Sequence, residues 1–168
     1  MLLATVLFLI GLPLRTPAAV GGIVDFELAG TEDRARAILQ SWQDRMGAVR
    51  WQLWLDFPFI FSYGGLLLLT ARSAARALRD AQRALVRMAA WMAGALGIVA
   101  ALLDMVENGF LLAMLPDRPS QTLVEWATTA ARTKFKLLLA TAALLALCWG
   151  QVIIGRARVG GARKRSGQ

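Results

Sequence analysis

The stretch MAAWMAGALGIVAALLDMVENGFLLAML, Met88–Leu115, is apolar over most of its length and contains no charged residue before Asp104. About 20 consecutive apolar residues suffice to cross the hydrocarbon core of a bilayer as a helix. The stretch exceeds that length, yet its second half carries two acids and an amide: Asp104, Glu107 and Asn108. It therefore predicts a membrane-spanning helix that holds a polar cluster.

Three further apolar runs accompany this stretch along the 168 residues. Hydrophobic residues make up 57% of the chain, whereas soluble domains contain about 45–50%. The four predicted spans are about 1–24, 51–71, 88–115 and 135–154. We therefore predict an all-α fold, an integral membrane four-helix bundle that forms one domain over 1–155. The basic residues 156–168 are expected to form an irregular cytoplasmic tail.

The first run has two interpretations. Residues 1–14 are apolar, but as a helix they measure about 21 Å, less than a core about 30 Å thick. A retained span would extend to about residue 24. A signal peptide would be cleaved near Thr16-Pro17-Ala18, although this is a poor cleavage site and no basic segment precedes the run. The retained span is favoured, and both interpretations stay open.

Positive charge is concentrated in two segments beside the spans. The net charge is +8, and the 72–87 connection carries one acid against five arginines: Arg72, Arg76, Arg79, Arg83 and Arg87. Cytoplasmic connections are enriched in Lys and Arg, so this connection and both termini are predicted to be cytoplasmic. The five arginines either mark this topology or also bind anionic lipid headgroups. Membrane topology therefore explains the positive charge, and no nucleic-acid partner is predicted.

The scarcity of histidine and cysteine excludes several kinds of site. The chain has no histidine and one cysteine, Cys148, which lies in an apolar run and is expected to be a packed residue. Disulfides within the chain, thiolate zinc sites, histidine-ligated haem and Ser-His-Asp or Cys-His catalysis are therefore excluded. The sequence identifies no catalytic residue and no cofactor, and it leaves open whether the protein is an enzyme.

An amphipathic helix is predicted in the first outer connection, over residues 31–46. Its apolar residues share one helical face: Ala35, Ile38, Leu39, Trp42 and Met46. Thr31 is a suitable N-cap, and acids follow it in the first turn. Such a helix would lie on the outer membrane surface or fold over the bundle.

Polar residues of several spans are predicted to meet in the outer half of the bundle. In the third span they continue a face of small residues that lets another helix, or a second copy of the chain, approach closely. The second span offers an acid and a phenol on one face, and Lys134 and Lys136 at the start of the fourth offer counter-charge. The candidate binding cluster is Asp56, Tyr63, Asp104, Glu107, Asn108, Lys136 and Glu27.

The chemistry of this cluster has several interpretations. Close carboxyl groups in a low dielectric cannot all ionise, so at least one is expected to hold a proton near neutrality. The favoured function is binding of a cation, a proton or a lipid headgroup. One alternative is a membrane-embedded enzyme that uses carboxylate acid/base chemistry on a lipid-dissolved substrate. Another is a buried network that fixes helix register, in a structural subunit of a larger membrane complex.

Five segments resemble those of a known family. They are GIVDFELAG (22–30), ILQSW (38–42), LDFPFIFSYGGLLLL (55–69), LLDMVENGFLLAML (102–115) and KFKLLL (134–139). In this combination the chain resembles an uncharacterised family of small bacterial four-helix integral membrane proteins, from about residue 22 to 139. The resemblance implies four helices in a bacterial inner (plasma) membrane. It implies no activity, so the candidate residues rest on the physical argument alone.

Overall fold

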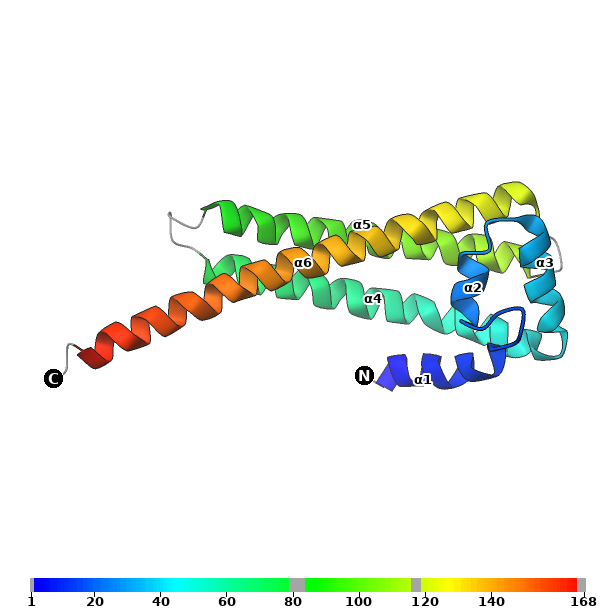
Figure 1. Ribbon diagram of the computed structural model, residues 1–168, viewed down its shortest axis with the longest axis horizontal. Helices are drawn as coiled ribbons and strands as arrows, with labels where there is room; N and C mark the ends of the chain where they lie inside the picture. The colour runs from blue at the N-terminus through cyan, green and yellow to red at the C-terminus, as the bar shows by residue number, and fades with distance from the viewer. Residues whose placement is uncertain (1, 79–83, 116–118, 166–168) are drawn as a thin grey trace. The chain divides into compact units, whose positions relative to one another are not determined.

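The computed structural model describes residues 2–78, 84–115 and 119–165, and no strand forms among them. Its α-helices are α1 (Leu2–Gly11), α2 (Ile23–Glu27), α3 (Glu32–Ser41), α4 (Met46–Ala77), α5 (Ala84–Met114) and α6 (Gln121–Arg165) (Figure 1). Two 3-10 turns, η1 (Leu12–Leu14) and η2 (Gln43–Arg45), complete the elements. The predicted all-α fold is confirmed.

Three of these helices are long and apolar enough to cross a membrane. The apolar segments are Gln43–Ala77, Ala84–Met114 and Gln121–Gly155, of 35, 31 and 35 residues. They contain the second and fourth predicted spans and all of the third except Leu115. The first predicted span is instead the ten-residue α1 followed by η1. Ten residues measure about 15 Å, half of a bilayer core. Pro13 lies in η1, and the chain then turns between Thr16 and Ala19.

The chain divides into two compact units. Unit 1 comprises Met1–Tyr63 and Ala100–Phe135, and unit 2 comprises Gly64–Val99 and Lys136–Gln168. Unit 1 contains α1, α2 and α3 together with one segment of each long helix. Unit 2 contains the other segments of α4, α5 and α6. All groups of the candidate cluster except Lys136 belong to unit 1.

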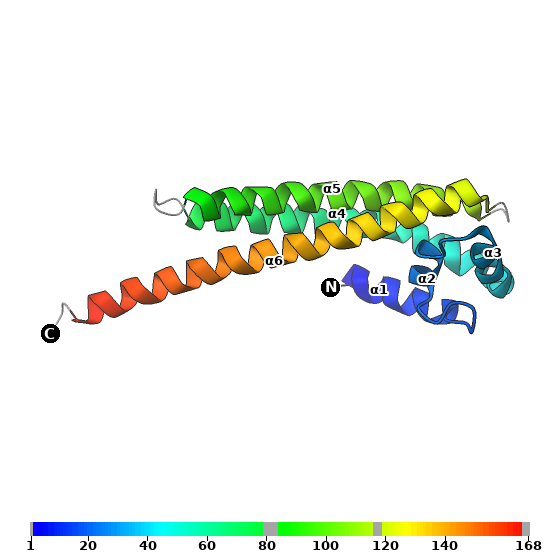
Figure 2. The same ribbon diagram turned by 45° about the horizontal axis from the view of Figure 1, so that its top comes forward.

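In unit 1 the amphipathic helix α3 runs across the segments of α4 and α5 (Figures 1 and 2). Thr31 caps it by accepting a hydrogen bond from the Arg34 N–H, at 3.4 Å, as its sequence predicted. The apolar face of α3 is buried, and it joins a core with residues of α2, α4, α5 and α6. Trp42 follows α3, packs edge-on against Phe26 and donates its indole N–H to the carbonyl of Leu14 at 2.7 Å. The face of α3 is thus occupied by protein.

In unit 2 small residues bring α4 and α5 close together. A Cβ added at Gly94 would lie 3.1 Å from the Cβ of Ala71, and one at Gly97 would lie 3.2 Å from Leu67. The small-residue face of α5 is therefore covered by another helix of the same chain. Cys148 of α6 is buried in this unit, as its apolar surroundings predicted.

The predicted C-terminal tail differs from the structure, and part of the predicted 72–87 connection lies outside the described residues. α6 continues to Arg165, whereas the sequence predicted an irregular tail from residue 156. Helical hydrogen bonds are local, so a helix can extend without tertiary contacts. In the 72–87 connection, α4 reaches Ala77 and α5 begins at Ala84. Arg79 and Arg83 lie outside the described residues.

Candidate functional site

A buried lysine forms the centre of the candidate site. The Nζ atom of Lys134 lies 2.6 Å from Asp104 Oδ1, 2.8 Å from Glu107 Oε2 and 3.3 Å from Glu27 Oε2. These four side chains, here called the Lys134 cluster, are each at most 10% exposed. Three carboxyl groups therefore meet one ammonium group in the interior of unit 1.

The start of α6 is tied to α3, and this fixes the position of Lys134. Gln121 and Glu32 exchange hydrogen bonds, with the Glu32 N–H donating to Gln121 Oε1 at 2.9 Å and the Gln121 N–H donating to Glu32 Oε2 at 3.1 Å. Further along α6, the Thr128 hydroxyl accepts from the Gly30 N–H at 3.1 Å. These bonds hold α6 against the segment that contains Glu27.

α5 supplies Asp104 and Glu107 because it buries one face along its whole length. From Ala90 to Asn108 the buried residues of α5 follow helical spacing and change from small to polar: Ala90, Ala93, Gly94, Gly97, Ala100, Ala101, Asp104, Glu107 and Asn108. Residues three and four apart share a helix face, so the acids must point where the small residues point. The acids consequently face protein and not the exposed side of the helix.

Glu27 enters the cluster at the end of α2. The turn before α2 requires Gly22, which has φ +66°. Burial raises the pKa of the Glu27 carboxyl above its ordinary value, and the Lys134 ammonium opposes this effect. The Glu27 and Glu107 carboxyl groups meet at the same ammonium, with Lys134 Nζ 3.3 Å from Glu27 Oε2 and 2.8 Å from Glu107 Oε2. Two carboxyl groups can hydrogen-bond to each other only when one of them carries a proton.

Two hydrogen bonds connect α5 to α4 at the site, and the first of them involves the Lys134 cluster. The Tyr63 hydroxyl donates to Asp104 Oδ2 at 2.7 Å. Next to it, Asn108 Nδ2 donates to Asp56 Oδ2, also at 2.7 Å. Asp104 therefore accepts from a phenol and an ammonium group, whereas Asp56 accepts from an amide and forms no ion pair with the described residues.

Glu107 is fully buried and is the least satisfied acid of the cluster. Its Oε2 contacts Lys134 as an ion pair without hydrogen-bond geometry, and its Oε1 has no hydrogen-bond donor among the described residues. A buried carboxylate oxygen without a donor is costly. A proton on the Glu27–Glu107 pair would lower this cost.

The structure brings together most of the residues proposed from the sequence. Asp56, Tyr63, Asp104, Glu107, Asn108 and Glu27 all lie in unit 1 and are linked by the contacts given above. Lys136 is exposed and makes no ion pair with the described residues, and Lys134 holds the central position. Residues two apart on a helix point in different directions, so only one of the two lysines can face the carboxyl groups.

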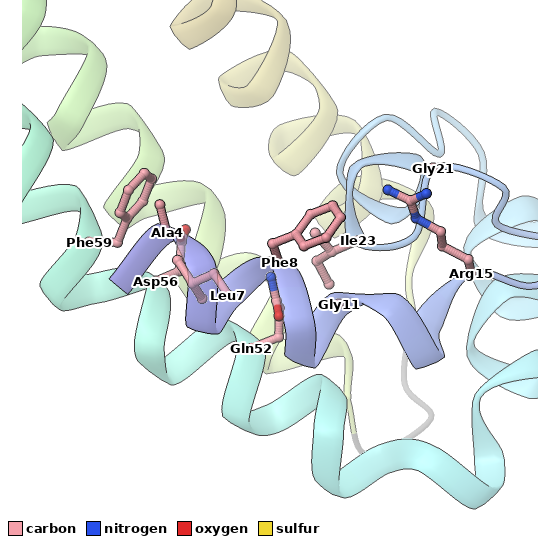
Figure 3. A pocket seen from close by; sticks show the side chains of 10 residues that line it. All are labelled: Ala4, Leu7, Phe8, Gly11, Arg15, Gly21, Ile23, Gln52, Asp56 and Phe59. Atoms are coloured by element: carbon pink, nitrogen blue, oxygen red, sulfur yellow. The ribbon is translucent and has the colours of Figure 1, made fainter. Parts of the chain in front are cut away.

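A pocket of about 290 Å³ lies beside Asp56 in unit 1 (Figure 3). Gln52, one helical turn before Asp56 on α4, also lines it, as does Arg15. Neither residue belongs to the cluster predicted from the sequence. Their spacing from Asp56 offered one signal, because Gln52 and Asp56 are four apart and so share a face of α4. Nothing in the sequence placed Arg15 near them.

Comparison of the chain with family models, with curated proteins and with solved structures finds no match. The function is therefore inferred from the geometry of the Lys134 cluster and from the apolar helices that carry it.

Proposed function

We propose that the chain is an integral membrane protein whose Lys134 cluster binds and releases a proton. The observation that carries the proposal is that one buried ammonium group meets three buried carboxyl groups. With every group ionised, the Lys134 cluster would hold a net charge of −2 in a low dielectric. Uncompensated buried charge is expensive, so uptake of a proton is favoured.

The length and composition of α4, α5 and α6 support the membrane location. In this proposal the three helices cross a bacterial inner membrane, α1 enters it as a short fourth helix, and α3 covers the outer end. The arginine-rich 72–87 connection and both termini are cytoplasmic, in accordance with the positive-inside tendency. The Lys134 cluster then belongs to the outer half of the membrane.

A proton fits the Lys134 cluster better than a metal ion does. The Lys134 ammonium occupies the point where the three carboxyl groups converge, and it would repel a second cation there. A proton instead binds to a single carboxyl oxygen. The Glu27–Glu107 pair is the best position for it, because both groups contact Lys134 Nζ and Glu107 Oε1 has no donor among the described residues.

Infrared spectroscopy of the purified protein in lipid nanodiscs tests the proposal. We expect the carbonyl band of a protonated carboxylic acid at neutral pH, and its loss when the pH is raised. Glu27→Gln and Glu107→Gln should each abolish the band, because the remaining carboxylate then pairs with Lys134. Glu125→Gln is the matched control, since Glu125 is exposed on α6.

Two results would contradict proton binding. One is a wild-type spectrum without a protonated carboxyl band between mildly acidic and neutral pH. The other is a band that persists in both variants of the Glu27–Glu107 pair. Either result would assign the Lys134 cluster to the structural alternative, an ion-pair network that stays ionised and fixes the register of the helices.

A further inference from the structure

The pocket beside Asp56 has acceptor groups at one end and a cation at the other (Figure 3). α1 and α4 supply most of its walls, and the segment around Arg15 closes its far end. We infer that this pocket, here called the Asp56 pocket, binds the headgroup of a lipid that carries a primary ammonium and a phosphate group. The inference uses the proposed membrane location and does not depend on the proton site.

The acceptor end suits an ammonium group. Asp56 uses Oδ2 to accept from Asn108, and its Oδ1 accepts no hydrogen bond from the described residues. Gln52 presents a buried Oε1 atom that likewise lacks a donor within the described chain. A primary ammonium group has three N–H donors, so it can satisfy both acceptors and neutralise Asp56. A quaternary ammonium group has no N–H and can satisfy neither by hydrogen bonding.

The opposite end suits a phosphate group. The Arg15 guanidinium lies over the ring of Phe8, with 5.8 Å between its central carbon and the ring centroid. It is exposed and makes no ion pair or hydrogen bond with the described residues. A guanidinium group presents paired N–H donors that match two phosphate oxygens. The stacking on Phe8 holds the side chain at the edge of the pocket.

The walls of the Asp56 pocket favour a lipid over a free headgroup. Leu7 and Phe8 of α1 line the pocket. Phe8 is 57% exposed, and Leu9 beside it is 56% exposed. Apolar side chains exposed beside a polar pocket would contact acyl chains in a bilayer. A soluble compound with the same headgroup would gain nothing from that surface.

Native mass spectrometry of the full chain in mixed micelles tests this inference. The lipid probes are phosphatidylethanolamine, phosphatidylcholine and phosphatidylglycerol with identical acyl chains, together with free phosphoethanolamine. We expect the protein to retain phosphatidylethanolamine about tenfold better than the other two lipids, a difference of about 1.4 kcal/mol, because only its primary ammonium can make the charge-assisted contact with Asp56. Free phosphoethanolamine should be retained weakly.

Variants of the two pocket residues outside the Lys134 cluster complete the test. Arg15→Gln should lower retention of all three lipids by about tenfold, because each of them carries the phosphate, and Gln52→Leu should lower the preference for phosphatidylethanolamine by about tenfold. Arg132→Gln, another exposed arginine of unit 1, should leave both unchanged. Thermal unfolding identifies a variant that fails to fold, and the other variant then decides the outcome.

Three results would overturn the inference. Equal retention of phosphatidylethanolamine and phosphatidylcholine would mean that the primary ammonium is not recognised. Preference for phosphatidylglycerol would mean that only negative charge is recognised. Retention of phosphoethanolamine without preference among the lipids would assign the pocket to a free ligand. None of these results affects the infrared test, because Arg15 and Gln52 are not members of the Lys134 cluster.

Discussion

At the scale of single residues, the site depends on which of two lysines faces the carboxyl groups. Lys134 is buried and Lys136 is exposed, although both begin the same apolar run. Buried lysine stays charged only where anionic partners surround it. Three carboxyl groups surround the Lys134 ammonium, and their own negative charge is balanced mainly by Lys134.

Replacing the central lysine should destabilise the protein. We expect Lys134→Met to lower the free energy of unfolding by roughly 1–3 kcal/mol, because it leaves three buried carboxyl groups without a cation and these must take up protons. Chemical unfolding in mild detergent measures the change. The matched control, Lys136→Met, should change stability by less than about 0.5 kcal/mol because Lys136 is exposed.

The double variant Lys134→Met, Glu107→Gln should recover part of the loss, since it removes one of the unpaired acids. Equal losses for the two lysine variants, or strictly additive losses in the double variant, would contradict the central role of Lys134.

The pKa of Glu27 leads to a prediction about pH. Burial raises this pKa above its ordinary value of 4.5, with Asp104 adding to the increase and Lys134 and Glu107 opposing it. Below 4.5 the folded and unfolded states are both protonated. As the pH rises from 4.5 toward the folded-state pKa, Glu27 releases its proton in the unfolded chain before it does so in the folded protein. The contribution of Glu27 therefore lowers the free energy of unfolding as the pH increases.

Thermal unfolding at a series of pH values checks this prediction. The wild-type unfolding temperature should fall across that window more steeply than that of Glu27→Gln, which has no proton to release. Glu125→Gln, a change at an exposed acid, should follow the wild-type curve. A Glu27→Gln curve parallel to the wild type would show that Glu27 does not titrate differently on folding.

At the scale of elements, α5 combines two kinds of contact on one buried face. Gly94 and Gly97 bring its backbone close to α4 in unit 2, and its acids enter the polar cluster in unit 1. A single helix face thus serves both close packing and the polar site. Substitutions along that face should be costly, whereas substitutions on the opposite face should not.

A pair of identical glycine substitutions in α5 tests this contrast. Gly94→Val should lower the free energy of unfolding by about 1–3 kcal/mol, because an added Cβ already lies 3.1 Å from Ala71 and the γ carbons have no space. Gly109→Val should be tolerated, since no atom of the described residues lies within 4 Å of a Cβ at that position. Chemical unfolding in the same detergent compares the two variants. An equal loss of unfolding free energy at Gly109 would mean that the low helix propensity of valine, and not packing, causes the loss.

At the scale of the whole molecule, charge is distributed along the chain in a way that favours one orientation. The 72–87 connection carries five arginines and one acid, whereas the 15–50 connection has five arginines and five acids. In the membrane such asymmetry sets which connections remain in the cytoplasm. The proposed topology therefore depends on a property of the whole chain and not on any single contact.

Labelling of introduced cysteines tests this orientation. In a Cys148→Ala background, Ser120→Cys should react with a membrane-impermeant maleimide added to intact bacteria, because Ser120 is exposed in the connection proposed to lie outside. Arg76→Cys should react only after the cells are permeabilised. Labelling of the Arg76 position in intact cells would reverse the proposed topology.

The sequence alone determined the helical class, the three long apolar helices and the candidate acids. It could do so because periodicity and apolar run length act locally, along one element at a time. The N-cap at Thr31 and the buried face of α3 were predictable for the same reason.

Only the tertiary structure decided which residues meet. The selection of Lys134 over Lys136 depends on the rotation of α6, which the bonds of Gln121 and Thr128 to the α2–α3 region help to set. The place of Arg15 beside Gln52 depends on a turn after α1 that returns the chain against α4. Rotation and return of the chain arise from contacts between residues far apart in sequence, and no pattern within one helix encodes them.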